Sequence, residues 1–265
     1  TVHGIIDLVL MKSIKFDLAN PSKQPVLGDI PAELLEQAKK SRHELLDGVS
    51  EFDDKLMDKY IHDQEPTLEE LKTGLRTATI KHELVPVLCG ASFRNIGVQP
   101  LLDAICDYLP SPLDVPVPTA HNPHTDEEMV CSPDENAPFA ALAFKIARDQ
   151  FVGKLYFIRV YSGTLKAGET LLNATKRRKE RVSKLLRMHA NKQELIEEIR
   201  AGDIAAAVGL KDITTGDTLC QEDAPIIFER IKFPEPVVSM FIEAKTKAEQ
   251  DKLSNALGML QDEDP

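Results

Sequence analysis

The stretch "FVGKLYFIRVYSGTLKAGETL", residues 151–171, decides the fold of the chain's second half. Apolar residues recur with a period of two in "KLYFIRVYSG", in "AFKIAR" before it and in "ETLLNATK" after it, a pattern that is typical of strands. Glycines in "YSGTLKAGE", "RAGD" and "TTGD" indicate tight turns between them. Short strands at regular spacing with glycine turns predict an antiparallel barrel or sandwich, which we place at residues 138–230.

The first third of the chain has a different pattern. Residues 4–18, "GIIDLVLMKSIKFDL", predict one or two strands. Residues 31–75 carry 12 acidic and 6 basic side chains, which favour solvated helix faces or a docking surface for a basic partner. Helix start and stop signals in this segment predict three helices. Pro31 begins and Gly48 ends the first, and capping boxes at Ser50/Asp53 and Thr67/Glu70 begin the next two.

Residues 85–98, "VPVLCGASFRNIGV", form an apolar run that ends in small residues. We predict a short strand over 84–88, because Pro86 cannot donate to a ladder, and then a helix near Pro100. Backbone N–H groups approach nucleotides where a strand opens into such a turn, yet no phosphate-binding loop precedes it. The prolines of "LPSPLDVPVP", residues 109–118, predict a stiff connection and a domain boundary.

The last residues begin another unit. Residues 237–243 predict a strand, and Thr246 with Glu249 predicts a capping box. The leucines at 253, 257 and 260 form one stripe of the helix that follows. One strand and one helix cannot bury both of their faces, so we interpret this segment as the first half of a further domain, with its stripe uncovered.

Composition narrows the function classes. The 265 residues carry a net charge of −11, which argues against nucleic-acid binding by the whole surface. The four cysteines are scattered, which favours reduced thiols and a cytoplasmic location. We predict no metal site, although several potential ligands lie close together in a proline-rich stretch (His121, His124, Asp126, Glu127 and Cys131). No nucleophile–base arrangement is recognisable, so no catalytic residue is predicted.

One stretch is locally basic. Residues 175–187, "TKRRKERVSKLLR", hold seven Lys or Arg residues and one Glu. On strands joined by a hairpin, five of them would gather at one tip, where they would contact RNA phosphates. The alternative is a solvated hairpin without a partner. The five candidates are Lys176, Arg177, Arg178, Lys179 and Arg181.

The order of these pieces resembles bacterial elongation factor G, a translational GTPase. The resemblance runs over essentially the whole chain. It rests on "VPVLCGASFRNIGVQPLLDAICDYLPSPLDVP", "FVGKLYFIRVYSGTLKAGETL", "RMHANKQELIEEIRAGDIAAAVGLKDITTGDTL" and "FPEPVVSMFIEAKTKAEQDKL".

This resemblance implies a multidomain α+β and β fold. Its parts would be an α/β remnant of a GTPase domain with a helical inserted subdomain, an antiparallel β-barrel, and a truncated ferredoxin-like α+β start. The implied boundaries are 1–83 for the inserted subdomain, 84–112 for the last strand and helix of the GTPase domain, 113–137 for a linker, 138–230 for the barrel (domain II) and 231–265 for the start of domain III.

The resemblance also assigns the small-residue turn. Gly90, Ala91 and Ser92 correspond to the last guanine-recognition loop, commonly Gly-Ser-Ala, in which a backbone N–H contacts the guanine O6. A small side chain at position 92 is compatible with this role. The Ala91-Ser92 order removes a hydroxyl that would stabilise the loop, which affects loop rigidity more than base recognition.

The implied function is that of the parent protein. It would hydrolyse GTP with Mg²⁺ and drive tRNA and mRNA movement on the ribosome in the cytoplasm. Its partners would be ribosomal RNA and stalk proteins directly, tRNA and mRNA indirectly, and neither a membrane nor DNA. The chain itself would be an internal fragment lacking the N-terminal phosphate-loop half, and we therefore expect it to keep ribosome-facing surfaces but neither to bind GTP or GDP usefully nor to hydrolyse GTP.

Two alternatives remain. A paralogous translational GTPase, such as a ribosome-protection or release factor, would share the barrel, although the long 31–75 segment and the barrel's "ANK" loop favour elongation factor G. The other is a stand-alone, non-enzymatic adaptor that binds the ribosome or RNA.

Overall fold

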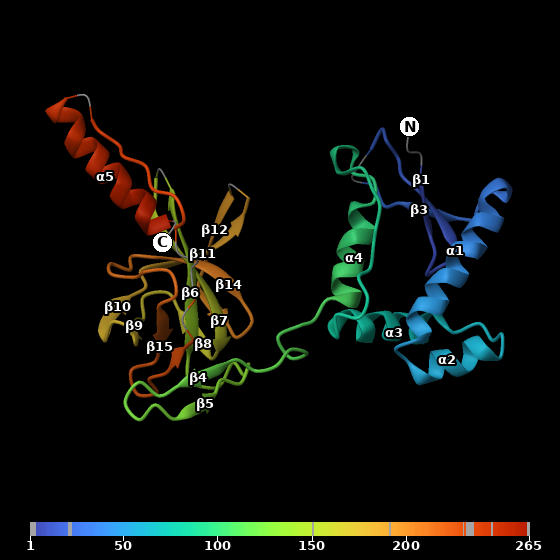
Figure 1. Ribbon diagram of the computed structural model, residues 1–265, viewed down its shortest axis with the longest axis horizontal. Coiled ribbons are helices and arrows are strands. Elements are labelled where there is room, and N and C mark those ends of the chain that lie inside the picture. Colours follow the sequence, from blue (N-terminus) through green and yellow to red (C-terminus); the bar gives the residue numbers. More distant parts are fainter. Residues whose placement is uncertain are drawn as a thin grey trace. The chain divides into compact units, whose positions relative to one another are not determined.

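The computed structural model describes residues 4–20, 23–149, 151–190, 192–229, 231, 236–244 and 246–263. The chain divides into two compact units, Thr1–Asp114 and Val115–Pro265, and the boundary falls inside the predicted proline-rich connection. Figure 1 shows the elements of each unit, which are described separately below.

The first unit begins with a small antiparallel sheet, in the order β1-β2-β3. Its strands are β1 (Gly4–Asp7), β2 (Lys12–Lys15) and β3 (Val26–Gly28), so the strands expected over residues 4–18 are confirmed. The turn between the first two is closed by Asp7, whose Oδ1 accepts the Val9 and Leu10 N–H groups at 2.8 and 2.9 Å.

The three predicted helices follow as α1 (Ala32–Ser50), α2 (Asp54–Ile61) and α3 (Leu68–Ile80). Pro31 directly precedes α1, and the Thr67/Glu70 capping box of α3 is confirmed. The other two boundary predictions are wrong. Gly48 lies inside α1, which continues to Ser50, and Asp53 rather than Ser50 caps α2. Ser50 is instead buried and bonds back to carbonyl oxygens of its own helix, and Gly48 does not have the positive φ of a helix-ending glycine.

A small core joins these helices to α4 (Val98–Tyr108), which begins near Pro100 as expected. Its buried members are Val49, Leu56, Leu71, Leu75 and Tyr108. Arg76 of α3 holds the end of α4: its Nη1 donates to the Asp107 and Leu109 carbonyl oxygens, each at 3.0 Å, and its Nη2 reaches Asp114 at 2.7 Å. These carbonyls have no partner within the helix, so an arginine there satisfies them.

The second unit contains an eight-stranded antiparallel sheet, in the order β10-β9-β15-β6-β7-β14-β11-β12. Only Val182 and Ser183 separate β10 from β11, yet these strands lie toward opposite ends of that order. Val182 N–H bonds to Glu169 beside β9, and Ser183 N–H bonds to Val208 of β14. One bent strand thus closes the sheet into a barrel, which confirms the prediction of an antiparallel β fold in its barrel form. The strands of this sheet are β6 (Ala140–Asp149), β7 (Gly153–Ser162), β9 (Thr170–Asn173), β10 (Arg178–Arg181), β11 (Lys184–His189), β12 (Lys192–Ile196), β14 (Ile204–Val208) and β15 (Thr218–Cys220). A separate two-stranded sheet pairs β8 (Thr164–Lys166) with β13 (Glu198–Arg200).

The barrel interior is filled by alternate residues of these strands. Tyr156, Ile158 and Val160 of β7 are all but fully buried there, together with Leu185 and Leu219. This period of two is the alternation seen in the sequence. Because the barrel is closed and its interior is packed, functional groups must lie on its outer surface and in its loops.

Residues 113–137 differ from the linker expected there. They contain the hairpin of β4 (Thr119–His121) and β5 (Glu128–Val130), to which β16 (Ile227–Phe228) adds a third strand. Ala120 and Phe228 of this small sheet join Cys131 and Cys220 in a second buried cluster. The strands are too short and too polar in sequence for their pairing to be predicted locally.

Two predicted strands are wrong. Residues 84–90 and 236–244 have no strand partner within the part of the chain that the structure describes. Their apolar side chains are largely exposed, with Val87 at 91% and Val237 at 96%. Strand-like sequence without a neighbouring strand leaves the backbone extended but unpaired.

The C-terminal helix is α5 (Lys247–Glu263). It begins with half of the predicted capping box, because the Glu249 carboxylate accepts from Thr246 N and Oγ1 at 3.1 and 3.0 Å. Leu257 and Leu260 of the predicted stripe are exposed, as expected, whereas Leu253 is half-buried.

Candidate functional site

The small-residue turn at residues 90–97 is built by backbone bonds. Ala91 N–H donates to Ile96 O at 2.9 Å and Ile96 N–H donates back at 3.2 Å, around a short 3-10 turn at Ser92–Arg94. Gly97 has a φ of +79°, and a Cβ on Gly90 would lie 2.6 Å from Ile96 O, so both positions require glycine. The turn is therefore shaped before any ligand arrives.

This geometry limits what the turn offers to a nucleotide. The Ala91 N–H is already used within the turn, whereas no backbone bond from the Ser92 N–H occurs among the described residues. Phe93 beside it is fully exposed. Among the described residues no bond from the Gly90 N–H is present either, so the N–H groups of Gly90 and Ser92 both remain for an outside acceptor, and the contact with guanine stays a prediction.

The basic stretch forms the β9–β10 hairpin, in which Arg178 pairs with Asn173 and Arg181 with Thr170. Arg177 lies in the turn with a φ of 56° and is exposed. Arg178, Lys179 and Arg181 follow on β10 with exposed side chains, and Lys176 precedes them half-buried. All five candidates therefore share one hairpin, and their contact with RNA stays a prediction.

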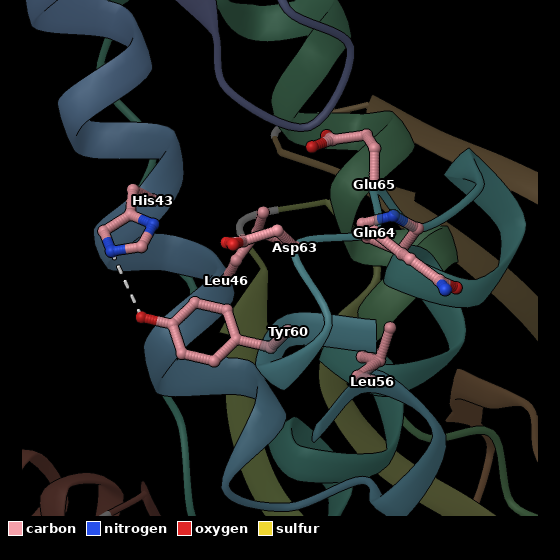
Figure 2. Close-up of a pocket in the computed structure, with 8 residues that line it drawn as sticks. His43, Leu46, Leu56, Tyr60, Asp63, Gln64 and Glu65 are labelled. Carbon is pink, nitrogen blue, oxygen red and sulfur yellow. Dashed lines mark hydrogen bonds between the residues drawn. The ribbon is translucent and has the colours of Figure 1, made fainter. Parts of the chain in front are cut away.

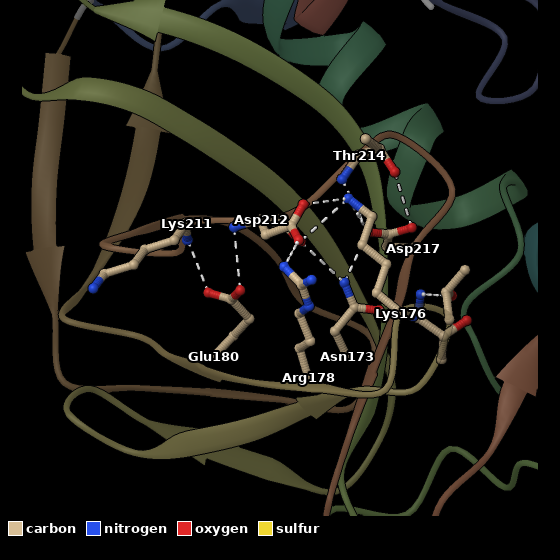
Figure 3. A network of polar contacts seen from close by, with 10 residues as sticks. Asn173, Lys176, Arg178, Glu180, Lys211, Asp212, Thr214 and Asp217 are labelled. Atoms are coloured by element: carbon tan, nitrogen blue, oxygen red, sulfur yellow. Dashed lines mark hydrogen bonds and ion pairs between the residues drawn. The ribbon is translucent and has the colours of Figure 1, made fainter.

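Acidic partners meet these cations, which the sequence analysis did not anticipate (Figure 3). Both oxygens of Asp212 are used: Oδ1 lies 2.8 Å from Lys176 Nζ and Oδ2 lies 2.7 Å from Arg178 Nη1. Lys179 Nζ lies 2.7 Å from a Glu222 oxygen, and Arg181 Nε donates to Gly168 O at 3.2 Å. Lys176, and after it Arg178, lowers the pKa of Asp212, so this carboxylate stays charged at neutral pH.

Beneath the exposed pairs lies a buried polar layer. Glu180, 5% exposed, accepts the Lys211 and Asp212 N–H groups at 2.8 and 3.1 Å. Asp217, 2% exposed, accepts from Thr214 N, Thr214 Oγ1 and Asn173 Nδ2 at 2.8–3.0 Å. These bonds fix the loop between β14 and β15 against the hairpin. Asp212 and Asp217 lie 34 to 44 residues from their partners on the hairpin, so no local pattern predicts the pairing.

A small cavity lies in the helical unit (Figure 2). Its volume is about 120 Å³, and it is lined by His43, Leu46, Leu56, Tyr60 and the 63–66 turn. Tyr60 Oη lies 3.2 Å from His43 Nε2, and burial, aided by the Asp47 carboxylate, raises the pKa of Tyr60. Small-molecule sites usually measure 300 Å³ or more, so we assign no ligand to this cavity.

Neither the cysteines nor the histidines gather into a site among the residues that the structure describes. No group of three His, Cys, Asp or Glu side chains is arranged to hold a metal ion there. Cys131 and Cys220 are buried beside the barrel, and burial raises the pKa of Cys131 to about 11. Such a thiol is protonated and unreactive at neutral pH. Within the same residues, no helix has the length and apolar character needed to cross a bilayer.

Comparison with known proteins matches two segments of the second unit. Residues 153–220, the barrel, match the family model described as elongation factor Tu domain 2, and residues 233–265 match elongation factor G, domain III. A crystal structure of the protein ttk003000868 from Thermus thermophilus is similar over 99% of this chain, with 27% sequence identity and a TM-score of 0.74. The chain spans only 36% of the length of that protein. The chain thus holds a segment similar to domain 2 of elongation factor Tu, followed by a segment similar to domain III of elongation factor G, and this succession supports a fragment of the elongation factor G type.

Proposed function

We propose that the protein acts on the ribosome as an elongation factor of the elongation factor G type, in which GTP hydrolysis drives the movement of tRNA and mRNA. One observation carries this proposal: the barrel that matches elongation factor Tu domain 2 is followed directly by a segment that matches domain III of elongation factor G. The barrel alone would fit many translation factors, and the second match narrows the choice to factors with a domain III.

The test uses ribosome binding and translocation separately. We expect the chain to co-sediment with ribosomes and to be displaced by purified elongation factor G, because both would occupy one site. The gene product that contains this chain should then restore mRNA movement in a translation extract depleted of elongation factor G. Peptide release without mRNA movement would favour a release-factor paralogue, and failure to bind ribosomes would contradict the proposal.

The guanine contact is part of the same proposal. The Ser92 N–H and neighbouring groups would each contribute about 1 kcal/mol to the binding of guanine. Without contacts to the phosphates, an interaction of roughly 3 to 4 kcal/mol corresponds to a millimolar or weaker dissociation constant. Titration of the chain with labelled GTP and Mg²⁺ tests this, and micromolar, magnesium-dependent binding would show that the chain holds a phosphate site.

The hairpin supplies a candidate RNA contact. Arg177, Lys179 and Arg181 are exposed, so their replacement by Glu changes the surface charge without removing the contacts of Lys176 with Asp212 and Asp217. We expect weaker ribosome binding, and a salt dependence that flattens by roughly one unit per lost phosphate contact. An unchanged salt dependence of ribosome binding would show that the hairpin is a solvated surface without an RNA contact.

A further inference from the structure

The acid that pairs with the basic hairpin has the properties of a phosphate substitute. The Asp212 carboxylate presents two oxygens that share one negative charge, one to Lys176 at 2.8 Å and the other to Arg178 at 2.7 Å. A phosphodiester of RNA also presents two unbridged oxygens that share one negative charge. Charge-assisted bonds from Lys and Arg suit either anion.

The Arg178–Asp212 pair is easy to exchange, whereas the less exposed Lys176 keeps a second carboxylate, Asp217, at 3.5 Å when Asp212 leaves. The Arg178 side chain is 68% exposed and that of Asp212 is 42% exposed. Ion pairs at this exposure contribute little to stability, because water and salt solvate both partners once they separate. An incoming phosphate would therefore displace Asp212 from Arg178 at small cost.

The loop that carries Asp212 does not depend on its carboxylate. Glu180 holds the N–H groups of Lys211 and Asp212, and Asp217 holds Thr214. Asn173 Nδ2 also donates to the Asp212 carbonyl oxygen at 3.3 Å. The carboxylate is thus free to leave the hairpin while the backbone stays in place.

We propose that Asp212 occupies the position of an RNA phosphate on the β9–β10 hairpin and is displaced from Arg178 and Lys176 when RNA binds. This deepens the proposed function, on which it rests, by assigning the hairpin's ligand as the RNA backbone. A single phosphate binds Arg178 and Lys176 little more strongly than the Asp212 carboxylate that already occupies them. An RNA with successive phosphates gains more, because it also reaches Arg177, which has no ion-pair partner among the described residues. Asp212 thereby selects against weak or isolated anions.

The test is the Asp212→Asn variant of the whole chain. A labelled RNA duplex is titrated by fluorescence anisotropy at several KCl concentrations. We expect about fivefold tighter binding at low salt, because a nearby charge in water is worth roughly that factor. The dependence on salt should steepen by up to about one unit, because in the unchanged chain the displaced Asp212 carboxylate takes up a cation that offsets part of the counterion release. Binding no tighter than that of the unchanged chain would overturn the proposal.

Matched variants identify the cause of any gain. Asp223→Asn removes the same charge from an exposed position that forms no ion pair within the described residues, and it should leave affinity unchanged. Asp212→Glu keeps a carboxylate and should not gain, and Asp212→Asn in an Arg178→Gln background should lose most of the gain. An equal gain from Asp223→Asn would overturn the proposal, because net charge alone would then explain it.

Two further measurements distinguish this proposal from alternative explanations. Polyglutamate replaces RNA in a parallel titration, and an equal gain for that polymer would overturn the assignment to RNA. Thermal unfolding confirms that Asp212→Asn remains folded. The duplex assay needs no ribosome, so a gain there combined with no ribosome binding would contradict the proposed function and leave this inference standing.

Discussion

Arg42 is a cation buried inside the helical unit, with 8% of its surface exposed. Its Nη1 donates to the carbonyl oxygens of Leu8 and Val9 at 2.8 and 3.2 Å, and its Nε and Nη2 reach the Glu65 carboxylate at 3.2 and 2.6 Å. One side chain of α1 therefore joins the β1–β2 turn to the turn before α3. The guanidinium charge can be buried here because its Nε, Nη1 and Nη2 atoms all donate to acceptors.

We expect Arg42→Met to lower the free energy of unfolding of this unit by about 3 kcal/mol, because two carbonyl groups and a carboxylate lose their partner. Arg42→Lys should recover only part of the loss, because one ammonium group cannot satisfy both sides. Urea unfolding followed by far-UV circular dichroism measures both variants. Lys39→Met is the control, an exposed position of the same helix, and an equal cost at the two sites would contradict the assignment.

At the scale of one element, the capping box of α3 couples stability to pH. The Lys59 ammonium, followed by the Thr67 N–H and hydroxyl, lowers the pKa of Glu70 to about 2 from its ordinary value of 4.5. A carboxyl whose pKa is lowered by folding stabilises the fold above its unfolded value and loses that contribution as it is protonated. The stability of this unit should therefore fall between about pH 4.5 and 2.

Glu70→Gln should remove that part of the acid sensitivity, whereas Glu69→Gln, an exposed neighbour in the first turn of the same helix, should keep it. Thr67→Ala should cost about 1 kcal/mol at neutral pH, because one N-cap bond is lost. Thermal unfolding across the acid range measures all three. Identical pH profiles for Glu70→Gln and Glu69→Gln would refute the coupling.

Local signals predicted elements well where they were self-contained. The Thr67/Glu70 box needs only four residues of chain, and the barrel alternation needs only one strand, so both were predictable. Residues 84–88 and 237–243 have strand-like sequence, but a strand needs a partner that sequence does not supply. Gly48 does not end its helix, because it lacks the positive φ that a helix-ending glycine adopts, and α1 continues to Ser50.

The candidate site was predictable to the same extent. The concentration of positive charge at 175–187 is visible in the sequence, and so is the small-residue turn at 90–92. The neutralising acids are not, because Asp212 and Glu222 reach the hairpin only through the barrel's closure and its long-range strand pairing. Equally, only the structure shows that the Ala91 N–H is used inside its own turn.

At the scale of the whole molecule, the two units have separate cores. Leu71 is fully buried in the helical unit and Ile158 is fully buried in the barrel. We therefore expect two unfolding transitions rather than one. Leu71→Ala should move only the first unit's transition and Ile158→Ala only the barrel's, each by about 3 kcal/mol. Urea-dependent hydrogen exchange, resolved by peptide, measures the two units independently, and a joint shift from either variant would show that they unfold together.

The bent strand that closes the barrel also bears on how long the folded barrel lasts. A sheet with a free edge opens by losing its outermost strand one hydrogen bond at a time, and water replaces each broken bond. Here β10 pairs with β9 and β11 pairs with β14, and Val182 and Ser183, which join the two strands, bond to Glu169 and Val208, so the ring opens only when several of these bonds break together. Such a concerted event has a high activation barrier, and the height of that barrier sets the lifetime of the folded barrel. The lifetime of the barrel is then governed by its rate of opening, and substitutions at the buried Val182 should shorten that lifetime more than equally buried changes away from the junction.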